Sequence, residues 1–260
     1  MAQIVVFANR KGGSGKTTLA FNVASFLADN GNRCLLVDTD SQAHATVHAG
    51  LDPFKITFGV YEALVNFLEN QQAVSDLILP INVNFSILPA NEKLSALELE
   101  LKDLQNRESV LKDFLLELES EFNYIIIDTP PSLGLITINA LVASQYLVIP
   151  VKTDFLSLVG LSQMMNVYYR VNALLNPELK LLGIVPTIFD TRTRISKEAL
   201  NQLKSTFGPN RIFKPIRSDV KMMEASGHAL PIHKYCPRCR ATQDLQTFVE
   251  ELLRRISGNG

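Results

Sequence analysis

The sequence contains few cysteines, almost no net charge and no long apolar run. Because its three cysteines are odd in number and the chain otherwise resembles an enzyme, they indicate a reducing cytosol rather than a disulfide framework. The longest apolar runs, such as residues 146–151, have the length of a β-strand and fall far short of a membrane span. No signal peptide is evident. We therefore expect a cytoplasmic protein without a membrane-spanning segment.

The chain also lacks internal repeats, low-complexity tracts and linkers long enough to divide it. With 260 residues, of which 47% are hydrophobic, it can bury a large core as one α/β unit. Because the first apolar run begins at residue 3, we expect no DNA-binding domain before it. We therefore expect one domain over residues 1–260.

A glycine-rich loop is the most informative stretch present: Lys11-Gly12-Gly13-Ser14-Gly15-Lys16-Thr17-Thr18. The apolar run 3–7 before it predicts a buried strand, and residues 19–28 after it predict an amphipathic helix. Such a loop directs backbone N–H groups and the positive end of the helix into one small volume, where phosphate binds. Glycine is required because a Cβ would block the close approach. Lys16 can reach the β- and γ-phosphates, and the Thr17 hydroxyl can coordinate Mg²⁺.

This loop differs from the ordinary P-loop, which has glycine where this chain has Arg10, and it adds a second lysine, Lys11. The variant resembles the deviant Walker A ATPases, the superfamily that includes ParA, Soj and MinD. The resemblance implies that residues 11–18 bind ATP and that Lys11 crosses a dimer interface to touch the other subunit's nucleotide. An incidental glycine-rich turn is the alternative, which the flanking strand and helix disfavour.

A second signature follows the apolar run 33–37, which predicts a buried strand. Asp38 and Asp40 come at its carboxyl end, where α/β folds place their sites. ParA-like chains usually read Asp-x-Asp-Pro-Gln-Gly-Asn-Ala-Thr here, and this chain differs at Ser41, Ala43 and His44, which bear on the path of the loop and the rate of hydrolysis. The resemblance implies that Asp40 orients the attacking water. From the residues alone, a capping or turn role for the two aspartates stays open.

A third signature is the continuous apolar run 123–127, which predicts a central parallel strand buried on both faces. Asp128 at its end fits the Walker B role of holding the water shell of Mg²⁺. Together the motifs predict a magnesium site at Thr17, Asp40 and Asp128. The following Thr129-Pro130-Pro131-Ser132-Leu133-Gly134 would sense the γ-phosphate, and Asp-Thr-Pro-Pro-Ser resembles the ParA/Soj branch rather than MinD.

Charge is unevenly distributed along this nearly neutral chain. Residues 92–121 carry nine acidic and four basic side chains, whereas residues 190–221 carry eight basic and three acidic ones. The ParA/Soj pattern Asp-x-Arg-Thr resembles the segment that starts at Asp190, which implies that Arg192 contacts DNA. Neighbouring cations would extend the contact along phosphates: Arg194, Lys197, Lys204, Arg217 and Lys221. An ordinary solvated face is the alternative reading.

The remaining segments complete a βαβα pattern. Residues 61–68 predict a helix, and residues 85–89, 145–151 and 181–187 predict strands. Residues 152–161 lead into a further helix, and residues 189–196 open another that runs to Phe207. Residues 92–121 predict a mostly helical stretch with a leucine stripe that packs on the core. Residues 242–256 predict a last helix. MinD-like chains end in a membrane-binding helix, but mixed charges on this polar face favour a helix docked on the core.

Cys236-Pro237-Arg238-Cys239, with His233 and His228 nearby, has the spacing of a partial metal site. One chain supplies too few thiolates here for an all-cysteine site, although a two-fold dimer could bring two pairs around one Zn²⁺. We favour an ordinary surface loop.

The combined expectation is an α/β protein with a mostly parallel twisted sheet, helices on both faces, and a deviant Walker A P-loop. Lys11, Lys16 and Asp40 would carry catalysis with ATP and Mg²⁺. The resemblance implies an ATP-bound homodimer that binds double-stranded DNA without sequence preference on the nucleoid. Slow hydrolysis, stimulated by a ParB-like or cargo-adaptor partner, would release it. A MinD-like membrane-surface ATPase and a metal-bridged carrier ATPase using Cys236 and Cys239 are the alternatives.

Overall fold

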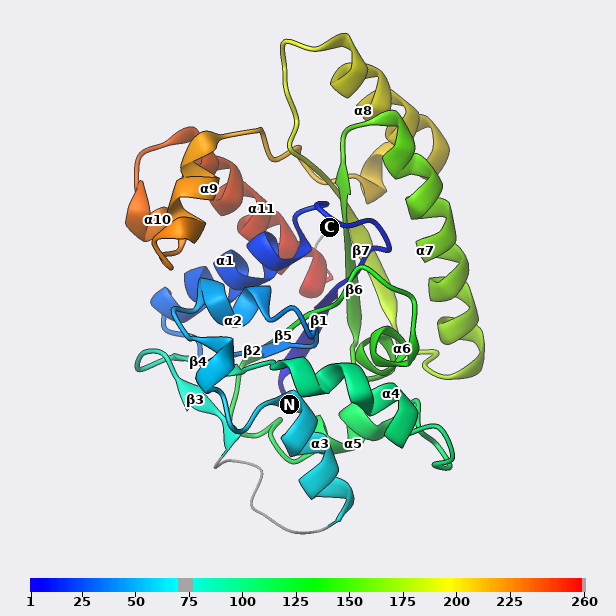
Figure 1. Cartoon of the computed structure of the whole chain (residues 1–260). Coiled ribbons are helices and arrows are strands. Elements are labelled where there is room, and N and C mark those ends of the chain that lie inside the picture. Colours follow the sequence, from blue (N-terminus) through cyan, green and yellow to red (C-terminus); the bar gives the residue numbers. More distant parts are fainter. Residues whose placement is uncertain (70–76, 259–260) are drawn as a thin grey trace.

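The computed structural model describes residues 1–69 and 77–258 and has one sheet in the order β3-β4-β2-β5-β1-β6-β7 (Figure 1). All neighbouring pairs are parallel except β3 and β4. The strands are β1 (Gln3–Phe7), β2 (Cys34–Asp38), β3 (Leu79–Pro80), β4 (Phe85–Leu88), β5 (Tyr124–Asp128), β6 (Tyr146–Lys152) and β7 (Lys180–Thr187). The six parallel strands lie where the sequence predicts them, and the mostly parallel fold is confirmed.

Helices cover both faces of this sheet, as the alternation of elements predicts. The α-helices are α1 (Lys16–Asp29), α2 (His44–His48), α3 (Val60–Leu68), α4 (Leu97–Glu100), α5 (Val110–Leu116), α6 (Leu135–Val142), α7 (Phe155–Leu174), α8 (Arg194–Phe207), α9 (Val220–Gly227), α10 (Ile232–Tyr235) and α11 (Arg240–Ile256). The described residues also form the short 3₁₀ turns η1 (Pro53–Lys55), η3 (Glu92–Ala96) and η4 (Pro209–Arg211).

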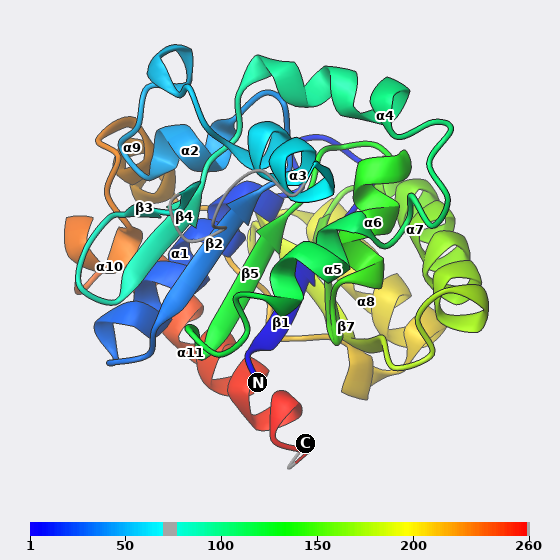
Figure 2. The same ribbon diagram turned by 90° about the horizontal axis from the view of Figure 1, so that it is seen from below.

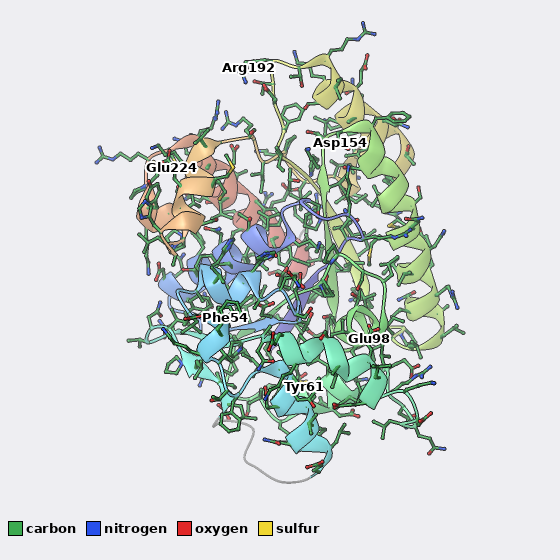
Figure 3. All side chains as sticks on the ribbon, in the orientation of Figure 1. Phe54, Tyr61, Glu98, Asp154, Arg192 and Glu224 are labelled. Carbon is green, nitrogen blue, oxygen red and sulfur yellow. The ribbon has the colours of Figure 1, made fainter. Side chains whose placement is uncertain are left out.

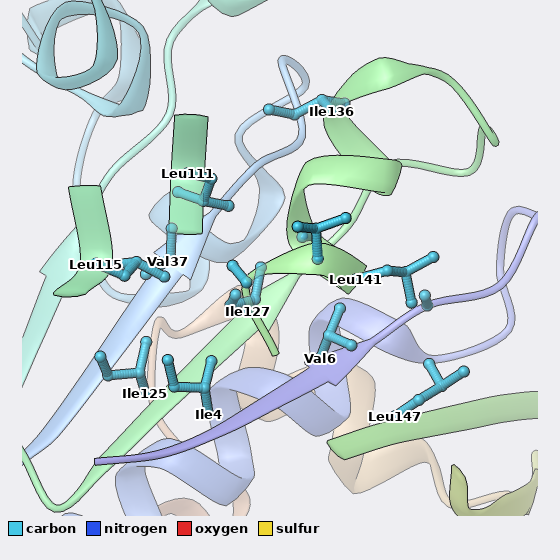
Figure 4. Packing of buried hydrophobic residues seen from close by; sticks show 14 of the residues in the cluster. Ile4, Val6, Val37, Leu111, Leu115, Ile125, Ile127, Ile136, Leu141 and Leu147 are labelled. Atoms are coloured by element: carbon cyan, nitrogen blue, oxygen red, sulfur yellow. The ribbon is translucent and has the colours of Figure 1, made fainter. Parts of the chain in front are cut away.

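Alternate residues of each central strand pack against different helices. In β1, Ile4 and Val6 belong to the cluster shared with α3 to α8, whereas Val5 and Phe7 belong to the cluster shared with α1 and α11. Figure 4 shows the first cluster, and Figure 2 shows strands between the two sets of helices. Because both faces are covered, every residue of β2 is buried, which explains the continuous apolar runs in the sequence.

The topology brings the carboxyl ends of three strands together at one edge of the sheet. β5 lies between β1 and β2, and its last residue, Asp128, is in register with Phe7 on one side and Asp38 on the other. The loops that leave these strands are the glycine-rich loop and the two aspartate signatures. The sheet therefore gathers all three signatures at one place, where parallel α/β folds bind ligands.

The acidic segment 92–121 is less helical than its leucine periodicity predicts. It forms η3, α4 and α5, with turns from residue 101 to residue 109 and again after α5. Asn106 adopts a left-handed backbone conformation with a φ of 58°, which ends any continuous helix. The predicted stripe consists of the leucines at positions 94, 97, 101, 104, 111, 115 and 118. Its core-packing role is confirmed for six of them, since Leu104 alone in this set is exposed.

The last helix docks on the core, as predicted. Leu245, Phe248, Val249 and Leu252 of α11 are buried beneath the sheet, and the Phe248 ring contacts those of Phe7 and Phe213. Its apolar face is therefore covered by the protein itself. Within residues 1–69 and 77–258, the helices are all too short or too polar to cross a membrane.

Candidate functional site

The glycine-rich loop joins β1 to α1 and leaves the start of that helix uncapped. Gly13 and Gly15 have φ values of 69° and 88°, a left-handed conformation that favours glycine at these turns. No side chain caps α1, and its first turn contains no acidic residue. The Thr187 hydroxyl donates to the Ser14 carbonyl at 2.8 Å, which ties the loop to β7. The loop thus presents free N–H groups and the positive end of α1, an arrangement that binds phosphate.

Lys16 lies under this loop, facing acidic side chains. It is only 6% exposed. Burial lowers the pKa of its ammonium group, while the charges of Asp128 and Asp40 act in the opposite direction. Its Nζ makes one long contact, 3.5 Å, with the carbonyl of Lys11. A buried cation held this loosely is available to a phosphate oxygen.

Lys11 is bound within its own chain, which the sequence does not predict. Its Nζ donates to Asp154 Oδ1 at 2.8 Å and to Ser157 Oγ at 2.9 Å. Asp154 caps the start of α7, where Figure 3 shows it, and accepts from the Ser157 N–H at 2.9 Å. Burial would raise the pKa of Asp154, but its bonds to Lys11 and Ser157 outweigh burial and lower that pKa to about 2. In this state Lys11 points to α7.

Asp38 holds the loop that follows β2. Its Oδ2 accepts from both the N–H and the hydroxyl of Thr46 at 2.8 Å, and its Oδ1 accepts from the Asp40 N–H at 3.1 Å. Complete burial raises the pKa of Asp38 to about 6, with the bonds from Thr46 opposing the rise. Both oxygens of Asp38 are therefore occupied by the loop, so Asp38 has the turn role that the sequence left open.

Asp128 presents the opposite case, a carboxylate with no protein partner. It is completely buried, and neither oxygen has a hydrogen bond of normal geometry within the described part of the chain. Burial first, and the charge of Asp38 second, raise its pKa well above the ordinary value; the nearby Thr17 hydroxyl opposes this shift without meeting hydrogen-bond geometry. An orphaned buried carboxylate beside a threonine fits Mg²⁺ with its water ligands, since Mg²⁺ prefers oxygen donors.

Asp40 lies near Lys16 and Asp128, and within residues 1–69 and 77–258 its Oδ2 has no hydrogen-bond partner. It is 6% exposed, and its Oδ1 accepts from the Gln42 N–H at 3.0 Å. Ala43, one of the departures from the ParA-like pattern, adopts a left-handed φ of 53° and immediately precedes α2. An alanine in this conformation costs about 1–2 kcal/mol, but the loop keeps its turn.

A pocket of about 240 Å³ adjoins the outer side of the glycine-rich loop. Gly13, Gly15 and Thr18 line it together with residues from distant segments that the motifs do not link to the nucleotide: Thr187, Ile188, Ile216, Arg217, Ser218, Asp219, Met222 and Met223. The sheet edge brings these segments to the loop.

Four of the predicted DNA contacts form ion pairs with neighbouring carboxylates. Arg192 bonds Asp190 through Nε and Nη2, at 3.0 and 2.8 Å, on the loop between β7 and α8 (Figure 3). The other pairs are Arg194 with Glu198, Arg217 with Asp244, and Lys221 with Glu224. Lys197 lies on α8. A polar pocket of about 380 Å³ brings Arg192, Arg217 and Lys221 together with Arg240, although they are far apart in sequence.

His233 does not join Cys236 and Cys239 in a metal site. His233 Nε2 instead lies 2.7 Å from Asp29 Oδ2, and its ring packs against Phe26. Across the described residues, no group of three or more histidine, cysteine, aspartate or glutamate side chains is arranged to hold a metal ion. Both thiols are free and half-buried.

Comparison with known proteins identifies relatives along the whole chain. A family model described as an AAA domain matches residues 2–181. The chain is 37% identical to the sporulation initiation inhibitor protein Soj of Bacillus subtilis over 262 residues, which covers 100% of both chains. It is 36% identical over 256 residues to the chromosome partitioning protein ParA of Myxococcus xanthus, covering 98% of this chain and 89% of ParA.

Solved structures share the fold. Cobyrinic acid a,c-diamide synthase of Mycobacterium smegmatis, solved with ADP and magnesium, has a TM-score of 0.87 and 30% identity, covering 100% of this chain and 97% of the other. Apo McdA of Cyanothece has a TM-score of 0.88 at 23% identity and supports the fold alone. The chain is 36–37% identical to Soj and ParA over at least 98% of its length, and it has the deviant Walker A signature. It therefore belongs to the ParA/Soj family of chromosome-partitioning ATPases.

Proposed function

We propose that this protein is an ATP-hydrolysing positioning switch, built as one ATPase domain over residues 1–260. The observation that carries this proposal is the buried, unpartnered carboxylate of Asp128 beside Lys16 and the uncapped start of α1. Gly12 to Thr18 would hold the phosphates through backbone N–H groups, with Lys16 as the buried cation. Asp128, Thr17 and Asp40 would hold the magnesium ion, which spreads the negative charge of the phosphates during transfer.

The base of ATP would lie in the 240 Å³ pocket. The pocket directly adjoins the phosphate loop through Gly13, Gly15 and Thr18, and Ile216, Met222 and Met223 offer apolar surface to a purine ring. Asp40, with one oxygen free, would orient the attacking water. Because no arginine is placed over the loop by the motifs, unaided turnover should be slow and a partner protein would complete the site.

Two subunits would close face to face around two nucleotides. Lys11 would then leave Asp154 and Ser157 and cross to the partner's nucleotide, so that nucleotide charge competes with the ion pair seen in the single chain. The Lys11–Asp154 pair is about 30% exposed on each side, which makes it weak enough to exchange.

Replacing Lys11 by alanine tests this proposal. The variant should bind ATP as the parent does but dimerise at least about tenfold more weakly, because a cross-subunit charge contact is lost. Arg10→Ala, which removes an exposed cation from the same loop, is the matched control and should dimerise normally. Sedimentation velocity with ATP and Mg²⁺ measures the outcome. Normal dimerisation of Lys11→Ala would contradict the proposed role of the second lysine.

The closed dimer would bind double-stranded DNA without sequence preference. Arg192 is 87% exposed in the ion pair with Asp190, so a phosphate can displace Asp190 at little cost. Arg194, Lys197 and Lys221 would add contacts, while Arg217, bonded to both oxygens of Asp244, is the least available. Pairing of two subunits doubles the number of phosphates met, so affinity should rise with ATP and fall with salt.

Replacing Arg192 by glutamate should weaken binding to unrelated duplexes by at least about tenfold and reduce its salt dependence, while ATP-dependent dimerisation remains. Arg170→Glu, the same charge change on the exposed surface near the end of α7, is the control. Filter binding with ATP and with ADP, at two salt concentrations, makes the measurement. Equal DNA binding by the parent and Arg192→Glu, or equal DNA binding with ATP and with ADP, would contradict the proposed ATP-dependent binding to the nucleoid.

The cellular role would be to position a cargo on the nucleoid, with a ParB-like or cargo-adaptor protein stimulating hydrolysis in the cytoplasm. Slow hydrolysis in the absence of the partner suits such a switch, because the partner then sets the lifetime of the DNA-bound dimer. The membrane alternative is not favoured, since the apolar face of α11 is buried in the core.

A further inference from the structure

The turn between α10 and α11 carries two thiols that the nucleotide site does not use. The Cys239 N–H donates to the Cys236 carbonyl at 3.1 Å, which closes a four-residue β-turn. A β-turn keeps its first and fourth Cα atoms within about 7 Å, and disulfides span Cα separations of about 4.4–6.8 Å. The backbone thus already brings the two cysteines within the range that a disulfide requires.

The turn is held in place by neighbouring helices. The Cys236 N–H donates to the Ile232 carbonyl at 2.8 Å, and the Thr242 hydroxyl donates to the Cys236 carbonyl at 2.8 Å. The Ile232 N–H in turn donates to Asn22 Oδ1 of α1 at 2.7 Å. These bonds restrict the turn, so the two sulfurs stay near each other and their effective concentration is high.

The two thiols are chemically unequal. Cys239 is the N-cap residue of α11, whose first turn contains no acidic side chain, so the helix end favours a thiolate there. Burial would raise the pKa of Cys239, but bonds from Thr242 outweigh burial and lower that pKa. The side chain of Cys239 is the first cause of a raised pKa at Cys236. Cys239 is therefore the attacking thiol and Cys236 the resolving one.

We propose that Cys236 and Cys239 form a redox couple that closes reversibly to an intramolecular disulfide, with a low-molecular-weight disulfide of the glutathione type as oxidant. The Cys239 thiolate attacks one sulfur of the oxidant, forms a mixed disulfide and expels one thiolate. Cys236 then loses its proton, attacks the Cys239 sulfur and expels the second thiolate. Two electrons pass to the oxidant, which leaves as two thiols carrying the two protons.

Metal binding is a weaker use of the same pair. His233 is bonded to Asp29, and the described residues offer no third ligand group, whereas a closed tetrahedral site needs four ligands. The third cysteine does not compete, because Cys34 is fully buried in β2 and burial raises the pKa of its thiol to about 12. This inference is independent of the proposed ATPase cycle.

The test treats the reduced full-length chain with about 1 mM glutathione disulfide, followed by acid quenching, alkylation and intact-mass measurement. The parent should lose two hydrogens, and the closed form should exceed the glutathione adduct by at least about tenfold. Cys236→Ser should stop at a stable adduct on Cys239, while Cys239→Ser should react several-fold more slowly at Cys236. Cys34 should become alkylated only after unfolding.

Three results would overturn the proposal: stable glutathione adducts on the parent, a disulfide between two chains, or a parent that stays reduced while Cys236→Ser forms its adduct. Thermal unfolding of both serine variants shows whether each has kept the fold. Because the decisive comparison of closed form with adduct is made on the unmodified chain, a misfolded variant would not decide it.

Discussion

Replacing Asp40 by asparagine should lower the rate of ATP hydrolysis by a factor of about 10²–10³ and leave ATP affinity within a few-fold of the parent. Asp40 lies at the end of β2 with one oxygen uncommitted, so its loss removes the group that would orient water. Asparagine keeps an oxygen to accept the Gln42 N–H, so the loop should hold its path. Single-turnover phosphate release measures the rate, and a fluorescent ATP analogue measures the affinity.

Asp103→Asn is the matched control for this prediction, since it makes the same chemical change on an exposed turn outside the proposed site. Its turnover should equal that of the parent. If Asp40→Asn turned over at the parental rate, another group would have to orient the water. Asp38 is poorly suited to that role, because Thr46 and the Asp40 N–H already occupy its two oxygens.

Replacing Asp128 by asparagine should have two opposite effects. Without nucleotide, the variant should be more stable than the parent by about 1–3 kcal/mol at pH 8, because a buried carboxylate without a hydrogen bond is removed. Lys16 then still faces Asp40, so it keeps a negative neighbour. With Mg²⁺ and ATP the order should reverse, since affinity for the complex should fall by about 10–100-fold.

The pH dependence of stability follows from the direction of the Asp128 shift. A carboxyl group whose pKa is raised by folding holds its proton longer in the folded state than in the unfolded chain. The parent therefore loses stability as pH rises above the unfolded value of about 4 towards the raised folded pKa. Asparagine removes this loss, so the advantage of the variant should be large at pH 8 and smaller at pH 5.

Urea unfolding with a chelator present, at both pH values, measures this difference. Asp103→Asn, the same chemical change on an exposed turn, is the control and should leave stability within about 0.5 kcal/mol. An Asp128→Asn protein that is less stable than the parent at pH 8 would mean that the carboxylate is satisfied in the folded chain.

The sequence by itself determined the elements whose signal is local. Strands buried on both faces require unbroken apolar runs, so residues 3–7 and 123–127 were recognisable without any knowledge of their neighbours. The glycine-rich loop was recognisable for the same reason, since its positive φ angles and close approach to phosphate restrict the residues that can occupy it. The motifs predicted the family, and sequence identity of 36–37% to Soj and ParA over nearly the whole chain confirmed it.

The tertiary structure alone decided which side chains meet. Lys11 and Asp154 are 143 positions apart, and only the parallel sheet brings the start of α7 to the glycine-rich loop. The same holds for the pocket wall at Met222 and Met223, because no local pattern encodes a neighbour reached through several crossovers. The interruption of the predicted helix at Asn106 could not be predicted, because regularly spaced leucines indicate a buried face but not the backbone angle of a single residue. Periodicity and propensity act over a few residues, whereas ion pairs and pockets depend on the path of the whole chain.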